Sequence, residues 1–401
     1  MAKESEDKES RIQELLTRGV EDVIERPHLE SALRSGRKLR VKLGIDPTAA
    51  NLHLGHAVVL GKLRQFQELG HKAVLIIGDF TATIGDPSGR VEAREPLTAA
   101  QVKENMRKYL LQAGKVIDLK HVEVRRNSEW HVKKGLAAIL ELASVATVQQ
   151  VLKRQDFAVR ISEDRDITLM ETLYPLLQGY DSVAVRSDVE LGGTDQLLNV
   201  LMGRKVQRHY KIPEQDILTV SLMEGLDGSK KMSKSVGNTV NLLDSPEDMF
   251  GKTMSLPDAL IVRWLTLATD VPLEKVAEYE HRLKEGINPK IIKGDLAARI
   301  VRRYYGDKAA VNSAQEWENV FSKKDLSAAE FPEIKLPKSA GTMMVVMTSG
   351  VVTSKGEARR LIEQGAVSVD GKVQKDWNAK INFSGGEIVK IGKRHFFKVK
   401  I

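Results

Sequence analysis

Cysteine is absent from this chain of 401 residues. Disulfides and thiolate metal sites are therefore excluded. Long hydrophobic runs are also missing, because no stretch of about 18 residues or more is apolar throughout, and a membrane span is not expected. The first ten residues are polar and of mixed charge, which does not fit a secretory signal peptide. Together these absences predict a cytoplasmic protein.

The remaining composition is that of an ordinary globular protein, with 42% hydrophobic and 29% charged residues. A chain of this length exceeds one typical core, so two or three domains are expected. The formal net charge is +8, and residues 340–401 hold 11 Lys and Arg against 5 Asp and Glu, an excess of +6. A solvated surface could carry this charge. Its concentration in one terminal segment favours a phosphate backbone as partner.

An α/β fold is predicted by the order of patterns near the start of the chain. Residues 39–45 alternate as a strand does, residues 53–69 form an amphipathic helical pattern, and residues 73–77 are an apolar run typical of a buried parallel strand. This βαβ unit indicates a doubly wound, Rossmann-like parallel sheet. Ligands bind outside the carboxyl ends of such strands, where residues 44–48 and 78–81 lie.

The rest of the chain divides by pattern into helical stretches and a distinct terminal segment. Residues 97–174 are predicted to be a largely helical insertion in the sheet, and a further strand is expected over 183–189, before a helix that runs toward Gln207. The expected domains are a catalytic domain at 1–240, an α-helical domain at 241–330, a two-proline linker at 331–339, and a small α+β domain at 340–401 with a hairpin turn at Asp370-Gly371.

Two short motifs point to chemistry on a nucleotide. Residues 53–56 read His-Leu-Gly-His at a predicted helix start, so both imidazoles share one face near the positive end of the helix dipole. Residues 228–235 read Gly-Ser-Lys-Lys-Met-Ser-Lys-Ser, a loop whose ammonium groups can follow a departing pyrophosphate. Alone, each motif also fits ordinary cap histidines or a solvated loop. Together they fit a site that stabilises charge developing on ATP.

These motifs and the segments around them resemble bacterial tyrosyl-tRNA synthetases, a family of the class I aminoacyl-tRNA synthetases. The resemblance extends from about residue 10 to the C-terminus and rests also on residues 44–56, 84–90 (Ile-Gly-Asp-Pro-Ser-Gly-Arg) and 191–196 (Leu-Gly-Gly-Thr-Asp-Gln). It implies that the chain joins tyrosine to tRNA(Tyr) in two steps, with ATP as a substrate and Mg²⁺ on the phosphates. It also implies a homodimer formed through the helical insertion.

For the ATP end of the site, the resemblance assigns roles to the matched positions. Charge on ATP would be stabilised by His53, His56, Lys231 and Lys234, with Thr48 and Arg94 near the phosphates. The other matched ATP positions are Asp46, Gly55, Gly192, Asp195 and Met232.

For the amino acid, the resemblance assigns the α-amino group to Tyr174, Gln178 and Asp86, the phenol hydroxyl to Asp181, and further contacts to Thr81 and Gln196. Tyr174, Gln178 and Asp181 share one face of a predicted helix. Their apolar neighbours favour a buried pocket over a solvated polar stripe. Phenylalanine would leave the aspartate unpaired.

Two positions depart from many bacterial members. Lys42 stands where those members have a tyrosine that touches the phenol, and Glu190 stands where they have glutamine. The phenol contact is therefore expected to rest more heavily on Asp181.

An RNA-binding face is expected near the C-terminus. Residues 354–371 resemble a small RNA-binding domain first known from a ribosomal small-subunit protein, which in the family contacts the variable arm and anticodon region of the tRNA. Lys355, Arg359 and Arg360 would lie on one side of a helix and suit phosphates. An ordinary charged surface helix is the alternative.

Two other functions remain open at this point. A tryptophanyl-tRNA synthetase would share both ATP motifs, but it would not need Asp181 for a phenol. An RNA-binding protein could keep the fold without catalysis, although the histidines and lysines of both motifs are intact.

Overall fold

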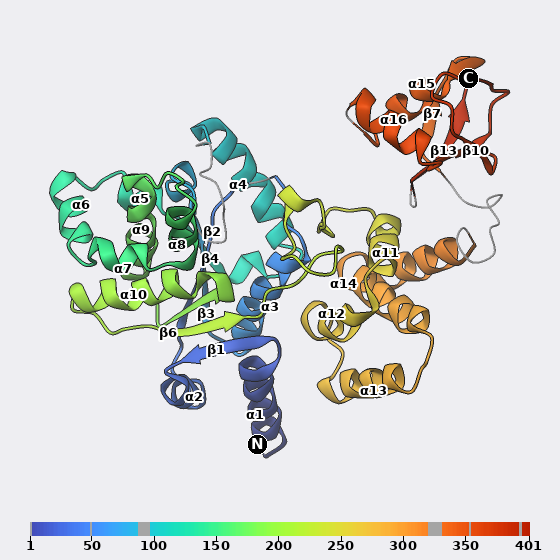
Figure 1. Ribbon diagram of the computed structural model, residues 1–401. Helices are drawn as coiled ribbons and strands as arrows, with labels where there is room; N and C mark the ends of the chain where they lie inside the picture. Colours follow the sequence, from blue (N-terminus) through green and yellow to red (C-terminus); the bar gives the residue numbers. More distant parts are fainter. Residues whose placement is uncertain (1, 49, 87–96, 320–330, 353, 393–394) are drawn as a thin grey trace. The chain divides into compact units, whose positions relative to one another are not determined.

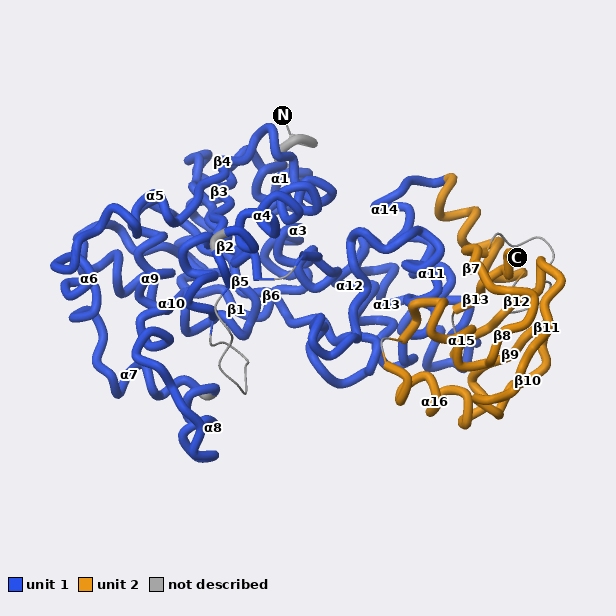
Figure 2. The backbone as a smooth tube through the Cα atoms, turned by 90° about the horizontal axis from the view of Figure 1, so that it is seen from above, with its two compact units in different colours: residues 1–307 blue, residues 308–401 orange. Residues whose placement is uncertain are grey.

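The computed structural model describes residues 2–48, 50–86, 97–319, 331–352, 354–392 and 395–401. The chain forms two compact units, residues 1–307 and residues 308–401 (Figure 2). Among the described helices, none combines the length and the hydrophobicity that crossing a membrane requires.

Unit 1 is built on a six-stranded sheet with the order β1-β6-β5-β2-β3-β4 (Figure 1). In chain order the strands are β1 (Val20–Ile24), β2 (Arg40–Ile45), β3 (Lys72–Ile77), β4 (Val122–Arg126), β5 (Val189–Gly193) and β6 (Asp216–Val220). β1 runs antiparallel to β6, and the other neighbours pair in parallel. β3 and β6 are buried and largely apolar, as strands covered on both faces require, whereas β2 and β5 carry the buried charged residues Lys42 and Glu190. The predicted α/β parallel sheet is confirmed.

The predicted βαβ unit is also confirmed. Helix α3 (Leu54–Glu68) connects β2 to β3, and these strands pair along their whole length, from Arg40 with Lys72 to Ile45 with Ile77. Gly70 follows the helix at φ 88°, a left-handed conformation that suits glycine.

Helices account for most of the remaining residues of unit 1. Before and around the sheet these are α1 (Ala2–Thr17), α2 (Arg26–Arg34), α4 (Ala99–Ala113), α5 (Ser128–His131), α6 (Leu136–Ala143), α7 (Val148–Leu152), α8 (Gln155–Ser162), α9 (Leu169–Val185) and α10 (Leu197–His209). After the lysine loop come α11 (Pro246–Met254), α12 (Ile261–Ala268), α13 (Leu273–Lys284) and α14 (Pro289–Trp317). Gly306 interrupts α14 with φ 83° and ψ 176°, beside the boundary between the two units.

One prediction for the sheet was incomplete and another was wrong. The stretch at 97–174 is largely helical, as predicted, but it also contains strand β4, which pairs with β3 at an edge of the sheet. The strand expected at 183–189 is instead the end of α9, and β5 begins at Val189. Val185 is the last residue of α9 and packs with Val74 and Ile76 of β3.

Unit 2 contains a five-stranded sheet, β10-β9-β12-β13-β7, and a two-stranded sheet, β11-β8. Its elements are β7 (Glu333–Lys335), β8 (Ser339–Gly341), α15 (Thr342–Thr348), α16 (Lys355–Glu363), β9 (Val367–Val369), β10 (Lys372–Gln374), β11 (Lys380–Asn382), β12 (Ile388–Ile391) and β13 (His395–Lys400). The predicted small α+β unit is confirmed. So is the β9–β10 hairpin, whose turn residues Asp370 and Gly371 both have positive φ, 45° and 78°.

The predicted linker at 331–339 is corrected by β7. This strand pairs in parallel with β13, and Ile334 is buried opposite Val399 in the core of unit 2. The short polar stretch therefore belongs to a sheet, because one apolar side chain and the backbone pairing are enough to fix an edge strand. The boundary between the predicted helical domain and this linker lies outside the described residues.

Candidate functional site

The predicted site residues gather where strands of unit 1 end at their carboxyl ends. Asp46 follows β2, Thr81 follows β3, and the two glycines Gly192 and Gly193 end β5. Helix α9 brings Tyr174 to the same place, since its hydroxyl reaches Asp46. The position agrees with the rule that ligands of open α/β sheets bind at this edge.

The histidine motif starts helix α3. The backbone N–H of His53 donates to Nδ1 of His56 at 3.2 Å, and the two ring centroids are 3.9 Å apart. Desolvation, followed by the nearby charge of Lys231, lowers the pKa of His56 to about 4. Desolvation, the neighbouring His56 and then Lys231 lower the pKa of His53 further. Both imidazoles are therefore neutral at pH 7, and each offers one N–H donor.

The lysine motif meets the histidine motif at Gly55. A Cβ at Gly55 would lie 3.1 Å from the ring of His53, a tight contact, and 3.8 Å from the Cβ of Met232, an ordinary van der Waals distance, so Gly55 lies directly beside the lysine motif. Met232 is buried and its N–H donates to the carbonyl of Met223 at 2.8 Å. Lys231 forms an ion pair with Asp195. The structure thus brings the two distant motifs into contact.

Lys234 and Thr48 lie at the margins of this arrangement. Lys234 is exposed at the start of a 3₁₀ turn, Lys234–Val236, and Thr48 donates its backbone N–H to the carbonyl of Asp46 at 2.7 Å. Arg94 lies outside the described residues.

A polar cluster around Asp46 forms the start of the predicted amino-acid pocket. Tyr174 Oη donates to one carboxylate oxygen of Asp46 at 3.0 Å, and Thr81 Oγ1 donates to the other at 2.7 Å. A Cβ at Gly78 would lie 1.9 Å from the Asp46 carboxylate, so this approach requires glycine at the end of β3. Desolvation raises the pKa of Asp46 to about 7, and burial also raises the pKa of Tyr174.

Asp181 is buried and held by three donors that the sequence analysis missed. Trp130 Nε1 donates to it at 2.8 Å, His131 Nε2 at 2.9 Å and Asn127 Nδ2 at 3.3 Å. Asn127 also donates to Thr81 at 2.9 Å, which links Asp181 to the Asp46 cluster. All three donors follow β4 directly. Recognition of that strand would have been the signal that placed them at the site.

Asp86 lies in a second polar cluster with Gln196 from the turn after β5. Gln196 Nε2 donates to Asp86 at 2.7 Å, and Asn199 of α10 donates to Gln196 at 2.9 Å. Gln178 of α9 has a buried side-chain oxygen without a hydrogen-bond partner among the described residues. A buried acceptor of this kind is suited to a donor from a ligand.

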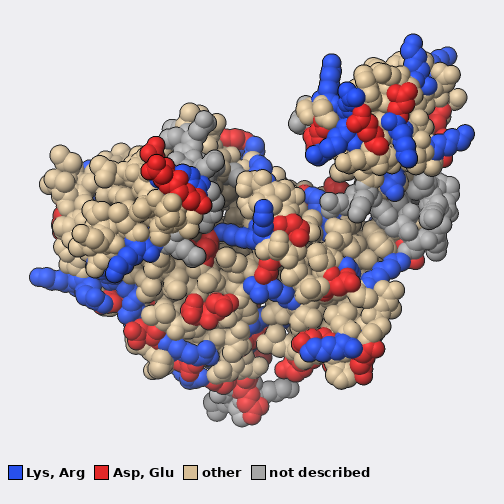
Figure 3. Space-filling view, viewed as in Figure 1, with Lys and Arg blue, Asp and Glu red and all other residues tan. Residues whose placement is uncertain are grey.

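The three predicted RNA-binding residues all lie on α16 of unit 2. Lys355, Arg359 and Arg360 are exposed, whereas Ile362 of the same helix is buried in the core. Figure 3 shows Lys and Arg side chains gathered over the part of unit 2 that contains this helix. Arg359 Nε also donates to the Glu363 carboxylate at 2.7 Å, so part of its charge is already neutralised within α16. Lys355 and Arg360 are therefore the more available cations.

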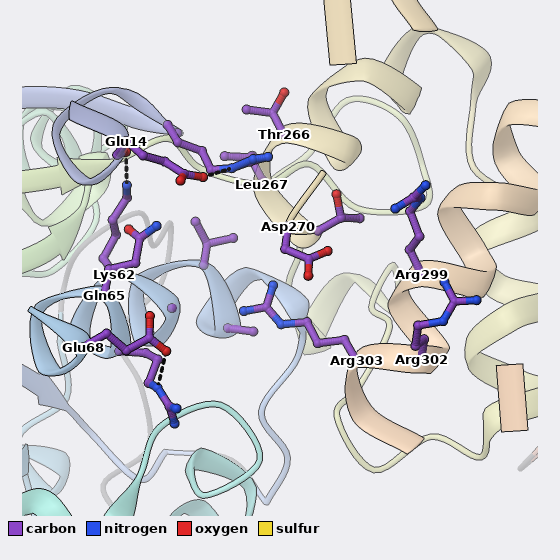
Figure 4. Close-up of a pocket in the computed structure, with 17 residues that line it drawn as sticks. Glu14, Lys62, Gln65, Glu68, Thr266, Leu267, Asp270, Arg299, Arg302 and Arg303 are labelled. Atoms are coloured by element: carbon purple, nitrogen blue, oxygen red, sulfur yellow. Dashed lines mark hydrogen bonds and ion pairs between the residues drawn. The ribbon is translucent and has the colours of Figure 1, made fainter. Parts of the chain in front are cut away.

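A cavity of about 530 Å³ elsewhere in unit 1 holds none of the predicted site residues among those that line it (Figure 4). It lies between α1, α3, α12 and α14. Its two buried cations already have acceptors, because Lys62 donates to the carbonyl of Leu15 at 2.8 Å and Arg18 donates to the carbonyl of Val271 at 2.7 Å. Lys62 thereby caps the end of α1, and we assign the cavity no part in the chemistry.

Comparison with known proteins gives a family for both units. Residues 34–322 match the family described as tRNA synthetases class I (W and Y), and residues 343–389 match the S4 domain. The tyrosine–tRNA ligase of Thermotoga maritima is 46% identical over 386 residues, which cover 96% of each chain. That of Symbiobacterium thermophilum is 45% identical over 394 residues, again 96% of each.

Solved structures show the same fold. A C-terminally truncated mitochondrial tyrosyl-tRNA synthetase of Aspergillus nidulans has a TM-score of 0.65 at 21% identity and covers 78% of this chain and 94% of its own. The tyrosyl-tRNA synthetase of Archaeoglobus fulgidus complexed with L-tyrosine has a TM-score of 0.62 at 21% identity, with coverage of 75% and 98%. From the extent and identity of the sequence matches, the chain belongs to the tyrosyl-tRNA synthetases, within the class I tRNA synthetases.

Proposed function

We propose that this chain activates tyrosine with ATP and then transfers it to the terminal adenosine of tRNA(Tyr). In the first step the tyrosine carboxylate attacks the α-phosphate, and tyrosyl-adenylate and pyrophosphate form. In the second step a ribose hydroxyl of the tRNA attacks the adenylate. The observation that carries the proposal is the meeting of the histidine and lysine motifs at Gly55, beside the polar cluster of Asp46 and Tyr174.

In the first step, the charge that develops on ATP would be met from two sides. Neutral His53 and His56 would donate N–H groups from the start of α3, while Lys231 and Lys234 would follow the leaving pyrophosphate on their flexible stems. Thr48 and Arg94 would lie near the phosphates. A carboxylate nucleophile is already ionised at pH 7, so the step needs no general base.

Nucleotide positions nearby would complete this end. Gly55 and Met232 would border the adenosine, Gly192 would let it approach the end of β5, and Asp195 would hold Lys231 until ATP arrives. Mg²⁺ would supply charge neutralisation on the phosphates. No group of three or more acidic or histidine side chains among the described residues is arranged to hold a metal, so the fit is to an ion that enters on ATP.

Selection of tyrosine would rest on Asp181. A carboxylate offers about four lone-pair sites, and three are occupied by Asn127, Trp130 and His131. The remaining site would accept the phenol O–H. Phenylalanine would leave that site empty in a buried pocket, which costs free energy and disfavours its binding.

The α-amino group would lie near Tyr174, Gln178 and Asp86, with Thr81 and Gln196 positioning the surrounding carboxylates. Asp86 accepts from Gln196, and Asp46, which the resemblance assigned to the ATP end, accepts from Thr81 and Tyr174. Both carboxylates are therefore oriented before a ligand enters.

For the second substrate, we propose that Lys355, Arg359 and Arg360 of α16 contact tRNA phosphates. Residues 1–240 would then carry both chemical steps, whereas residues 241–330 and 340–401 would hold the RNA. A homodimer formed through the helical insertion and a cytoplasmic location, where tRNA and ATP meet, complete the proposal.

ATP–pyrophosphate exchange with each of the twenty amino acids separately tests the proposal. Exchange with tyrosine alone is the expected result, since only tyrosine offers a phenol to Asp181. Exchange with tryptophan instead would overturn the specificity and leave the ATP chemistry in place. Folded protein that exchanges with no amino acid would overturn the enzymatic function and support the RNA-binding alternative.

A further inference from the structure

A buried ion pair lies under the proposed amino-acid pocket. Lys42 of β2 and Glu190 of β5 are cross-strand partners in the parallel sheet, and their side chains are 0% and 1% exposed. Lys42 Nζ lies 2.8 Å from Glu190 Oε1. Such a pair is weak evidence for stability, because desolvation offsets much of the attraction, so a role in specifying a geometry has to be considered.

The pair is completely hydrogen-bonded and joins the sheet to α9. Lys42 Nζ also donates to the backbone carbonyl of Gln178 at 3.1 Å and to Ser182 Oγ at 2.8 Å, which uses its three protons. Glu190 Oε2 accepts from Ser182 Oγ at 3.0 Å and from Gln215. The charge of Lys42 therefore allows the Glu190 carboxylate to stay buried beside the helix that carries the pocket residues.

The carboxylate controls how the amide of Gln178 can turn. Gln178 Nε2 lies 3.5 Å from Glu190 Oε1, and the amide oxygen of Gln178 is the buried acceptor without a partner. A carboxylate only accepts hydrogen bonds, so the amide must present its NH₂ group to Glu190. The oxygen is then forced to the other side, one helical turn from Tyr174 on the same face of α9.

We propose that Glu190, with Lys42 as its counter-ion, is a positioning residue that orients Gln178 so that its oxygen accepts from the α-ammonium of the amino acid. This inference rests on the proposed function. A neutral amide at position 190 could donate or accept, and it would allow Gln178 to turn its NH₂ group toward the ammonium. The cationic substrate would then lose an acceptor and face a donor.

Calorimetric titration with two ligands tests the inference. One ligand is L-tyrosine, and the other is 3-(4-hydroxyphenyl)propionate, which keeps the phenol and the carboxylate but lacks the α-amino group. In the variant Glu190→Gln, the dissociation constant for tyrosine should rise about tenfold, the effect of one lost charge-assisted hydrogen bond. Binding of the propionate should change less than about twofold, because it makes no use of the Gln178 oxygen.

A second variant and a control keep the result interpretable. Lys42→Met combined with Glu190→Gln removes both buried charges at once, so it avoids an unpaired ammonium and should show the same selective loss. Glu123→Gln on β4 removes a carboxylate that pairs with Arg40 at 3.0 Å in the same sheet, and it should alter neither ligand's affinity.

Equal losses for both ligands would show a general structural effect and overturn the proposal. Unchanged tyrosine affinity in the folded double variant would overturn it as well. A wild-type chain that bound the propionate but not tyrosine would contradict the acceptor role of Gln178. Wild-type protein that bound neither ligand would remove the proposed function, and this inference with it.

Discussion

The histidines at the start of α3 show how a single residue's environment sets its chemistry. Desolvation lowers the pKa of His56 to about 4, well below its ordinary value of 6.5. At pH 7 its imidazole therefore acts as a neutral donor that can be fixed in place without attracting ATP by charge. Such a donor stabilises the transition state when negative charge grows on the phosphates.

Replacing His56 with alanine should therefore slow formation of the adenylate by about 10²–10³-fold, the usual cost of one lost transition-state donor. The dissociation constant for tyrosine should stay within about twofold, because the pocket around Asp181 is untouched. Rapid quench of a single turnover, beside equilibrium titration of tyrosine, separates the two quantities. Equal losses in both would contradict a role confined to the transition state.

Asp46 carries a pH dependence of its own. Desolvation raises its pKa from 3.8 to about 7, with a further contribution from the Asp86 charge against the hydrogen bonds of Thr81 and Tyr174. The free carboxyl is thus largely protonated below pH 7. An ammonium group bound near Tyr174 favours the ionised form, so binding of tyrosine should expel a proton.

Tyrosine affinity should accordingly fall by about tenfold between pH 8 and pH 6. Calorimetry in buffers of different ionisation enthalpy would count the protons released near pH 6.5. Asp46→Asn is the control, since an amide cannot titrate and its residual binding should show a flatter pH profile. Tyrosine binding that releases no proton in the wild type would contradict the raised pKa.

At the scale of elements, the βαβ unit around α3 could be predicted because its signals are local. An alternating strand, a capped amphipathic helix and the apolar run before Gly78 each have their own pattern. The histidine motif, Asp46 and the hairpin at Asp370-Gly371 were found for the same reason.

Elements whose order depends on distant partners were missed. β4 reads Val-Glu-Val-Arg-Arg, which alternates only over its first four residues, carries charge and has one neighbour only, so its strand signal is weak beside the helical patterns that surround it. The three donors to Asp181 directly follow β4, so they were missed because the strand was missed. β7 has a single buried side chain, Ile334, and it exists because β13 is there to pair with it.

The position of Lys42 illustrates the same limit within a site. The sequence indicated only that Lys42 replaces a tyrosine, so that the contact of this tyrosine with the substrate phenol is absent. The structure supplies its partner from β5, a strand that comes almost 150 residues later in the chain. Chemistry that depends on the pairing of two strands cannot be read from either strand alone.

At the scale of the whole molecule, the tyrosine pocket and the proposed contacts with tRNA phosphates belong to different units. The pocket residues lie in unit 1, and the α16 cations lie in unit 2. A chain ended after residue 319 would lose every strand of the unit 2 sheet, including β7, and would keep all of the pocket.

This truncated chain should retain tyrosine-dependent pyrophosphate exchange within about twofold and lose aminoacylation by about tenfold or more at physiological salt, because its phosphate contacts are gone. Exchange itself serves as the check that unit 1 is folded. Unimpaired aminoacylation over a range of tRNA concentrations would refute an RNA-binding role for unit 2.

The antiparallel edge of the large sheet has a consequence for the growing chain. β1 is complete after 24 residues, but its partner is β6, and Val20 pairs with Val220. At about 5–20 residues per second, the ribosome needs roughly 10–40 s to make the intervening segment. During that interval the edge of β6 does not yet exist, so β1 cannot complete the sheet until more than half of the chain has been made, and a nascent-chain chaperone would find this strand exposed.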